Sequence, residues 1–104
     1  MMSEKNERLP TTVGQAVDML LSELSIEEKT KIANMSKDNL TGLHFSLGRF
    51  IRNEFKLLAD NEELMESCSL LSGQQDLHAD DASSVIIESL WESLQNSHVL
   101  KVLK

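Results

Sequence analysis

The sequence predicts an all-α fold, an irregular or orthogonal bundle of four to five helices in a single domain. Apolar residues recur at intervals of three and four along most of the chain, which is the period of an amphipathic helix. Strand signals are nearly absent, because tyrosine is missing, phenylalanine and tryptophan total four residues, and no alternating run lies between hairpin turns. The 104 residues, 40% of them hydrophobic, suffice for one core.

Composition divides the chain into three parts. Residues 1–10 are polar, of mixed charge, and end at Pro10, so we expect a disordered lead. Residues 11–96 carry the helical periodicity, and residues 97–104 form an apolar C-terminal tail. The lead has no signal-peptide core, and no apolar run approaches the roughly 20 residues that cross a bilayer. With a single cysteine, Cys68, no intramolecular disulfide can form, and we expect a cytoplasmic protein without membrane contact.

Two short helices are predicted at the start of the domain. Thr12 and Gln15 have the spacing of a capping box, in which each side chain satisfies a backbone N–H at the helix start. Ser25 and Glu28 repeat this spacing, so a second helix begins there and ends near residue 34 or 35. The apolar stripes of these helices contain Val13, Ala16, Val17, Leu20 and Leu24 in the first and Ile26, Ile32 and Ala33 in the second.

The strongest helical signal lies in the middle of the chain, where a long third helix is predicted from about Leu40 to Leu58. Gly48 lies near its centre. Because an internal glycine costs about 1 kcal/mol relative to alanine, we expect another helix or a packed side chain to approach closely there. The broad apolar stripe of this helix contains Leu40, Leu43, Leu47, Phe50, Ile51, Phe55 and Leu58.

Two further helices are predicted in the acidic half of the chain. Asp60 and Glu63 are expected to cap a short fourth helix that Gly73 stops. After a loop at 74–78, the last helix opens with two acids where the helix dipole favours them, and it fades near Asn96. The apolar positions are Leu64, Met65, Cys68 and Leu71, facing inward in the fourth helix, and Ala82, Val85, Ile86, Ile87, Leu90, Trp91 and Leu94 in the last.

One polar cluster stands out on the predicted third helix. His44, Gly48 and Arg52 are spaced four residues apart, so they share one helix face beside the apolar stripe. Arg52 is therefore expected to be half buried and to need a carboxylate partner, best supplied by Asp80 or Asp81. The cluster is either a structural clamp between two helices or a polar site for an external molecule. Its members are His44, Gly48, Arg52, Asn53, His78, Asp80, Asp81 and Ser83.

Other chemistries have little support in the sequence. No two histidines have the spacing of a zinc motif and no cysteine pair exists, so no metal is expected. Cys68 lies on an apolar stripe, no serine stands in a G-x-S-x-G turn, and no glycine-rich phosphate loop is present. We therefore expect no cofactor and favour a protein that is not an enzyme.

Charge and the apolar tail indicate the kind of partner. The net charge is −7, and residues 53–92 hold ten acids against one base, Lys56. Such a field repels phosphate backbones, so nucleic-acid binding is disfavoured. The sequence instead favours a protein partner or a homodimer, because aromatic side chains are over-represented at binding hot spots. The candidate partner contacts are Trp91, Val99, Leu100 and Leu103.

Three segments resemble a small bacterial family of uncharacterised domains. The stretch Leu43–Phe55 fits the pattern HFxLGxxIRNxF, and His78–Ile87 fits the pattern HxDDxSxxII. An opening like that of residues 12–21 is also shared, so the resemblance covers nearly the whole predicted domain, and it implies no activity. The chain departs from the family pattern by having Lys56 and Leu58 in place of a glycine and an aromatic residue.

We expect a non-catalytic protein-interaction or regulatory module of the bacterial cytoplasm. One alternative is a small-ligand-binding or enzymatic site built around His44, Arg52, Asn53 and Asp80. Another is a nucleic-acid-associated protein, which would need a local basic face and which the net charge disfavours.

Overall fold

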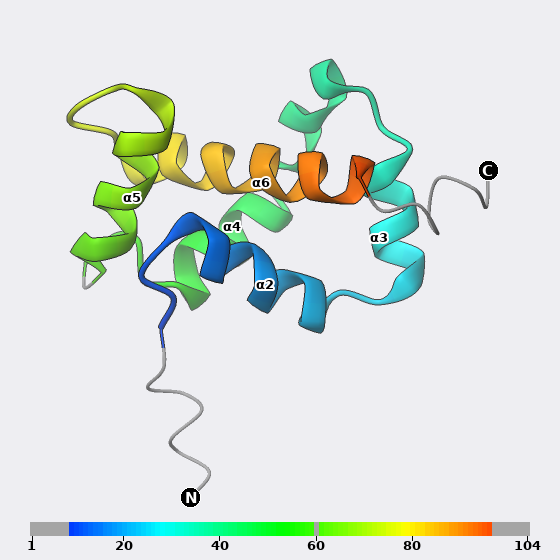
Figure 1. The fold of residues 1–104 in the computed structure, drawn as a ribbon, viewed down its shortest axis with the longest axis horizontal. Helices are drawn as coiled ribbons and strands as arrows, with labels where there is room; N and C mark the ends of the chain where they lie inside the picture. The colour runs from blue at the N-terminus through cyan, green and yellow to red at the C-terminus, as the bar shows by residue number, and fades with distance from the viewer. Residues whose placement is uncertain (1–8, 60, 97–104) are drawn as a thin grey trace, which may run out of the picture.

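The structure, a computed structural model, describes residues 9–59 and 61–96 of the chain. These residues contain helices and no strand, so the predicted all-α class is confirmed. Figure 1 shows α6 running through the centre of the molecule with the other helices arranged around it. The elements in chain order are α2 (Val13–Glu23), α3 (Ile26–Ala33), the 3-10 helix η1 (Lys37–Leu43), α4 (Leu47–Glu54), α5 (Glu62–Ser72) and α6 (Ala79–Gln95).

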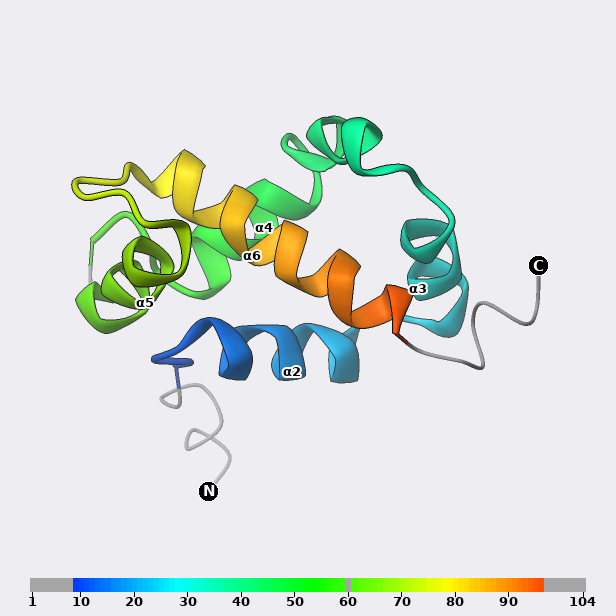
Figure 2. The ribbon, with the colours of Figure 1, turned by 45° about the horizontal axis from the view of Figure 1, so that its top comes forward.

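The core is built around α6. This helix contacts α2, α3, η1, α4 and α5, and its residues Ala82, Ile86 and Leu90 are completely buried. Figures 1 and 2 show α2 and α4 on different sides of α6, with α5 near its start and α3 near its end. α6 consequently positions each of the other described helices.

The first two helices begin where the sequence predicts. The Thr12 hydroxyl accepts a hydrogen bond from the Gln15 N–H at 3.1 Å. The Gln15 side chain accepts from the N–H of Thr11 and not from that of Thr12, so this capping box is only half formed. In α3 the box is complete, since Ser25 and Glu28 each accept from the other's backbone N–H.

The predicted long helix from Leu40 to Leu58 is wrong. The chain there forms η1, a turn at residues 44–46 and the shorter helix α4, which ends at Glu54. Both η1 and α4 contact α6. One straight helix that crosses α6 would contact it over only part of its own length. The apolar period is compatible with both arrangements, because each piece can turn its own apolar side chains toward α6.

The end of α4 explains a second error in the predicted core. Lys56 has φ 55°, the left-handed conformation that follows many helices. The Lys56 N–H donates to the Asn53 carbonyl at 3.4 Å. The Leu57 N–H donates to the Arg52 carbonyl at 3.1 Å, and the two bonds together form a Schellman motif. The chain turns here so that Leu57 is buried, whereas Leu58, predicted to lie on the apolar stripe, is 71% exposed.

The remaining helices differ from the prediction at local points. Asn61 caps α5 by accepting from the Leu64 N–H at 3.2 Å, in place of Glu63, while Asp60 lies outside the described residues. Gly73, with φ 79°, stops α5, and α6 has the predicted ends. Two residues predicted to lie on apolar stripes are instead exposed, namely Ile26 in the first turn of α3 and Leu71 in α5.

Some predictions concern residues outside the described ranges. The lead is described only at residues 9 and 10, of which Pro10 is buried. The tail at 97–104, with Val99, Leu100 and Leu103, lies outside these ranges. Within them, no helix combines the length and the apolar character that a membrane crossing requires.

Candidate functional site

Arg52 joins α4 to the first turns of α6. Its Nε lies 3.4 Å from Asp80 Oδ1, and its Nη1 donates to the Ser83 hydroxyl at 3.1 Å. The Ser83 hydroxyl donates onward to the Asp80 backbone carbonyl at 2.9 Å. The Arg52 side chain is 14% exposed and that of Asp80 is 65% exposed, so the guanidinium is largely enclosed while its carboxylate partner stays in water. This arrangement has the geometry of a clamp between two helices.

Gly48 lies directly against the Arg52 guanidinium. A Cβ at this buried glycine would lie 3.1 Å from Arg52 Nη1 and 3.6 Å from the Ser83 hydroxyl. The close approach predicted for Gly48 is therefore that of an arginine head group and not that of another helix backbone. The absence of a side chain at Gly48 leaves room for the clamp, at the usual glycine cost in a helix of about 1 kcal/mol.

His44 does not share a helix face with Arg52, because it lies in the turn between η1 and α4. Its ring meets that of Phe45 edge-on, with the ring centroids 5.5 Å apart. His44 also lines a cleft of about 160 Å³ between η1 and α6. At this cleft the Lys37 ammonium lies 2.7 Å from the Glu88 carboxylate, and the hydrogen bond and charge of Glu88 raise the pKa of Lys37.

The other members of the predicted cluster face solvent. Asn53, His78 and Asp81 are exposed, and His78 precedes α6 without a side-chain capping bond. The clamp therefore unites Gly48, Arg52, Asp80 and Ser83 but not the whole predicted set. Across residues 9–59 and 61–96, no group of three or more His, Cys, Asp and Glu side chains is arranged to hold a metal ion.

Trp91 fixes α3 to the last turns of α6. Its indole Nε1 donates to the Met35 carbonyl at 2.8 Å, and one turn later Gln95 Nε2 donates to the Ala33 carbonyl at 2.6 Å. Ala33 is the last residue of α3 and Met35 lies just beyond it, where the end of a helix leaves backbone acceptors without partners. Trp91, predicted as a partner contact, is thus partly buried in an internal role. No local sequence signal connects residues 35 and 91, so sequence reasoning missed this contact.

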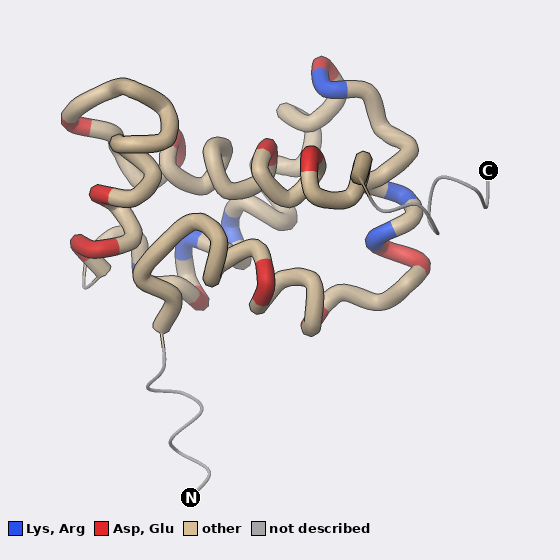
Figure 3. Tube along the Cα trace, viewed as in Figure 1, with Lys and Arg blue, Asp and Glu red and all other residues tan. Residues whose placement is uncertain are grey.

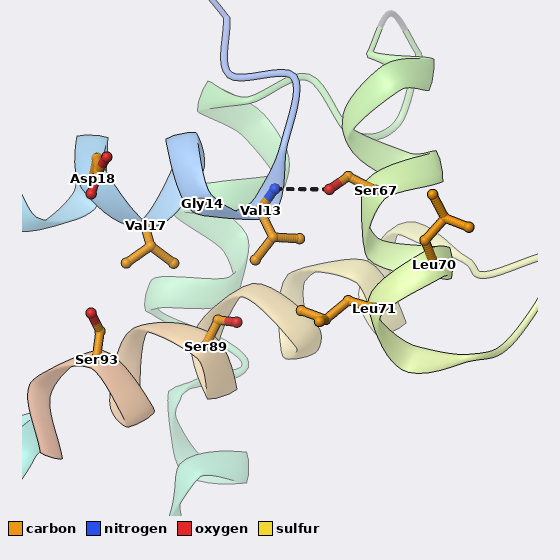
Figure 4. A pocket seen from close by; sticks show the side chains of 9 residues that line it. All are labelled: Val13, Gly14, Val17, Asp18, Ser67, Leu70, Leu71, Ser89 and Ser93. Atoms are coloured by element: carbon orange, nitrogen blue, oxygen red, sulfur yellow. Dashed lines mark hydrogen bonds between the residues drawn. The ribbon is translucent and has the colours of Figure 1, made fainter. Parts of the chain in front are cut away.

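An open groove lies between α2, α5 and α6, with a volume of about 730 Å³. Figure 4 shows Val13 and Val17 facing it from α2 and Leu71 reaching in from α5. The Ser67 hydroxyl accepts from the Val13 N–H at 3.0 Å, which ties α5 to the start of α2 at one end of the groove. The lining residues are Val13, Gly14, Val17, Asp18, Ser67, Leu70, Leu71, Ser89 and Ser93.

The three helices around this groove carry only acidic charges. Together α2, α5 and α6 contain nine Asp and Glu residues and no Lys, Arg or His. The basic residues of the described part lie on α3, η1 and α4 and in the turn after α4, as Figure 3 shows in blue. The acidic excess of this half of the chain is visible in the sequence, but the groove depends on how the three helices meet.

A second cavity of about 420 Å³ lies between α2, α3 and the segment leading into α4. Its wall is mainly apolar, and its charged residues are Glu23, Glu28 and Lys31. Glu28 is already engaged in the capping box of α3. Because Lys31 lies among the two acids, the negative charge of this cavity is partly compensated.

Cys68 has no features of a nucleophile. It is completely buried between α5 and α6, and its Sγ lies 3.6 Å from the Ala82 carbonyl. Burial raises the pKa of this thiol to about 11, so the reactive thiolate is scarce near neutral pH. The predicted packing role of Cys68 agrees with this position.

Comparison with known proteins identifies a family but no characterised relative. No curated protein and no solved structure matches the chain. A family model described as a domain of unknown function (DUF6794) matches residues 9–94. The matched residues run from before α2 almost to the end of α6, so they include both the Arg52 clamp and the acidic groove. The chain therefore belongs to this family of domains of unknown function.

Proposed function

We propose that this domain is a non-catalytic protein-interaction module that binds a basic, amphipathic protein segment in the groove between α2, α5 and α6. The observation that carries the proposal is the combination of exposed leucines with uniformly acidic helices at one open surface. A surface of this kind offers both an apolar contact and an electrostatic preference.

Leu70 and Leu71 supply the apolar part of the surface. Their exposed fractions are 77% and 59%, and Leu71 faces the groove together with Val13 and Val17, which are themselves largely buried. Single exposed leucines are common on soluble proteins, but a contiguous apolar patch in a concave surface is typical of a binding site. Covering such a patch with aliphatic side chains gains about 25 cal/mol per Å² of apolar area removed from water.

The acidic helices supply the preference for a basic partner. Asp18 lines the groove. Of the other eight acids on α2, α5 and α6, Asp80 pairs with Arg52 and Glu88 with Lys37, and the remaining six leave these helices with a net negative charge. Complementary charge speeds the encounter of two proteins and selects between partners more than it strengthens the final complex. A segment rich in lysine or arginine is therefore favoured, and an acidic one is repelled.

Small polar residues complete the groove. Ser89 and Ser93 present hydroxyls from α6, and Gly14 leaves the α2 wall open. A Cβ added at Gly14 would meet only the Thr12 hydroxyl within 4 Å, at 3.9 Å. Small side chains let a partner backbone come close, and hydroxyls can bond its amide groups as donors or acceptors. This wall suits a peptide segment better than a flat protein surface.

The test titrates the full chain with two fluorescein-labelled synthetic peptides that differ only in charge. One has leucine at helical spacing and lysine elsewhere, and the other has glutamate at every lysine position. We expect the lysine peptide to bind with an affinity that falls as NaCl is raised from about 0.05 to about 0.5 M, and the glutamate peptide not to bind.

Two leucine variants locate the binding surface. Leu71→Glu is expected to weaken binding of the lysine peptide about tenfold, since losing a central apolar contact costs about 1–2 kcal/mol. Leu58→Glu is the matched control, because Leu58 is a similarly exposed leucine that does not line the groove and the added charge is the same. Equal binding of both peptides, or equal losses in both variants, would contradict the proposal.

We also infer that the module works in the reducing cytoplasm of a bacterium. The support is the single cysteine, which can form no intramolecular disulfide, and the resemblance of the three motif segments to a bacterial family. Fractionation of the native host, with the chain detected by antibody, tests this location. Recovery in a secreted or membrane fraction would contradict it.

A further inference from the structure

We propose that in the free protein the groove between α2, α5 and α6 is occupied by this chain's own segment 97–104, which a partner segment must displace. This inference rests on the proposed function, because it uses the same groove and the same partner chemistry. It adds that segment 97–104 competes for the groove, so that an external segment binds with lower apparent affinity.

The composition of the segment matches the chemistry of the groove. Residues 97–104 read SHVLKVLK, with four aliphatic residues, two lysines and no acid. Other basic and apolar stretches, such as that from His44 to Arg52, are already committed to the turn before α4 and to α4 itself. Segment 97–104 is thus a basic, amphipathic sequence within the chain that no described helix uses.

The connection to α6 brings the segment to the groove. Ser93 lines the groove only three residues before Asn96, and Ser89 lines it one turn earlier. The last turn of α6 is held in place by the Gln95 hydrogen bond to the Ala33 carbonyl at 2.6 Å. A reversal after Asn96 would therefore direct the following residues back along the Ser93 and Ser89 side of α6.

The length of the segment is sufficient for this path. Eight extended residues span up to about 26 Å, and the 17 residues of α6 rise by about the same distance. Even if two residues are spent on the reversal, the rest can run past Ser93 and Ser89 toward the exposed Leu71. Side chains alternate between the two faces of an extended segment, so either Leu100 and Val102 or Val99 and Leu103 would cover the leucine patch. Both lysines would lie near the acidic helices.

Intrachain docking is favoured over exchange between two copies. A short tether gives the attached segment an effective concentration in the millimolar range, which exceeds the concentration of a second copy in dilute solution. The chain should therefore be a monomer whose groove is covered by its own segment. A dimer exchanging these segments is the competing arrangement, and the test separates the two.

The test uses the full chain and, as its probe, a fluorescein-labelled peptide with the sequence of residues 97–104. We expect the double variant Leu100→Glu/Leu103→Glu to bind the probe about tenfold more tightly than the unmodified chain, because its own segment no longer competes. Lys101→Glu/Lys104→Glu should give the same direction of change while keeping the leucines. Adding Leu71→Glu to either variant should remove the gain, whereas adding Leu58→Glu should leave it.

The outcomes distinguish this inference from the proposed function. Equal affinity of the probe for all tail variants and the unmodified chain would overturn the inference, while binding of the generic leucine–lysine peptide would leave the groove function intact. If neither peptide binds, both fail. Light scattering that shows a dimer of the unmodified chain and a monomer of the tail variants would overturn intrachain docking in favour of exchange between two copies.

Discussion

Arg52 holds α4 against α6 through two contacts with different surroundings. The hydrogen bond to Ser83 is enclosed, whereas the Asp80 carboxylate is 65% exposed and keeps most of its hydration. The ion pair itself therefore contributes little, and the enclosed donor and the packed arginine stem contribute most. We expect Arg52→Ala to lower the free energy of unfolding by about 1–3 kcal/mol and Asp80→Asn by less than about 1 kcal/mol. Urea denaturation measures both, and equal losses would contradict this ranking.

Cys68 makes stability depend on pH in the alkaline range. Burial raises the pKa of its thiol from 9.0 to about 11. Because the pKa of the thiol is higher in the folded chain, the unfolded chain loses the proton first as the pH rises. The contribution of the neutral thiol to stability is fully present below pH 9 and is lost as the pH rises toward 11. We expect the melting temperature to fall over this range, and to fall less steeply in Cys68→Ala.

For Cys68 the quantity to compare is the slope of the melting temperature against pH. The alanine variant also leaves a small cavity, which lowers the melting temperature at every pH. The raised pKa of Lys37 acts in the same alkaline direction in both proteins, so it cancels between them. Identical slopes in the two proteins would show that ionisation of the thiol does not contribute.

At the scale of helices and their ends, α4 stops at a residue that is poorly suited to stopping a helix. Lys56 adopts φ 55° at the position where glycine is usual. A left-handed conformation costs an L-residue about 1–2 kcal/mol, and the greater freedom of glycine in the unfolded chain offsets about half of that. We expect Lys56→Gly to stabilise the domain by about 0.5–1 kcal/mol in thermal denaturation, and Lys56→Ala, which keeps the strained backbone, to give no gain. A loss of stability in the glycine variant would contradict this.

The ends of helices divide the predictable from the unpredictable part of this fold. Ser25 with Glu28, and Gly73, act on backbone groups within a few residues, so the ends they set are visible in the sequence. The stop at Lys56 carries no such signal, because lysine is common inside helices. The apolar period alone therefore predicts one long helix where the structure has two separate ones, η1 and α4.

The candidate site divides in the same way. The Arg52–Asp80 pair could be predicted from the sequence. Arg52 lies beside an apolar stripe and needs a carboxylate partner, and the start of the last helix carries acids. The position of His44 could not be predicted, since its spacing to Arg52 has meaning only if one helix contains both. The groove could not be predicted either, because Leu71 lies on an apolar stripe whether or not another helix covers it.

The Asn61 side chain connects the residues before α2, the end of α4 and the start of α5. Its Nδ2 donates to the carbonyls of Pro10 and Phe55, each at 2.9 Å, and its Oδ1 caps α5 by accepting from the Leu64 N–H. The side chain is buried, so each partner that loses its bond stays without water. We expect Asn61→Ala and Asn61→Asp each to lower the free energy of unfolding by about 2–4 kcal/mol, measured by urea denaturation.

Asn61→Asp is the more informative of the two variants. It keeps the acceptor that caps α5 but turns a carboxylate toward two carbonyl oxygens, which the original amide approached with N–H donors. If capping alone mattered, the aspartate would be as good as the asparagine. A stability of Asn61→Asp equal to that of the unmodified chain would therefore show that the bonds to Pro10 and Phe55 contribute nothing.

At the scale of the whole molecule, the unequal distribution of charge should lower stability at low ionic strength. The chain has 17 acids against 10 Lys and Arg residues, and nine of the acids lie on the three helices around the groove. Repulsion among them acts over about 30 Å at 0.01 M salt and about 8 Å at 0.15 M. Salt also weakens the attractive pairs of Arg52 and Lys37, but these are few and partly exposed, so screening of the repulsion dominates.

We therefore expect the melting temperature to rise when NaCl is raised from about 0.01 to about 0.15 M, by several degrees if the repulsion is worth about 1 kcal/mol. Glu66→Lys, which places one base on α5, should raise the melting temperature at low salt and flatten its rise. Lys31→Glu, an exposed change on α3, should steepen it, because it adds to the net negative charge. A melting temperature that falls with salt would show that attractive pairs outweigh the repulsion. Because Glu66→Lys should also weaken binding of the lysine peptide, a gain in stability with a loss of binding would indicate that the acidic surface favours recognition at the expense of stability.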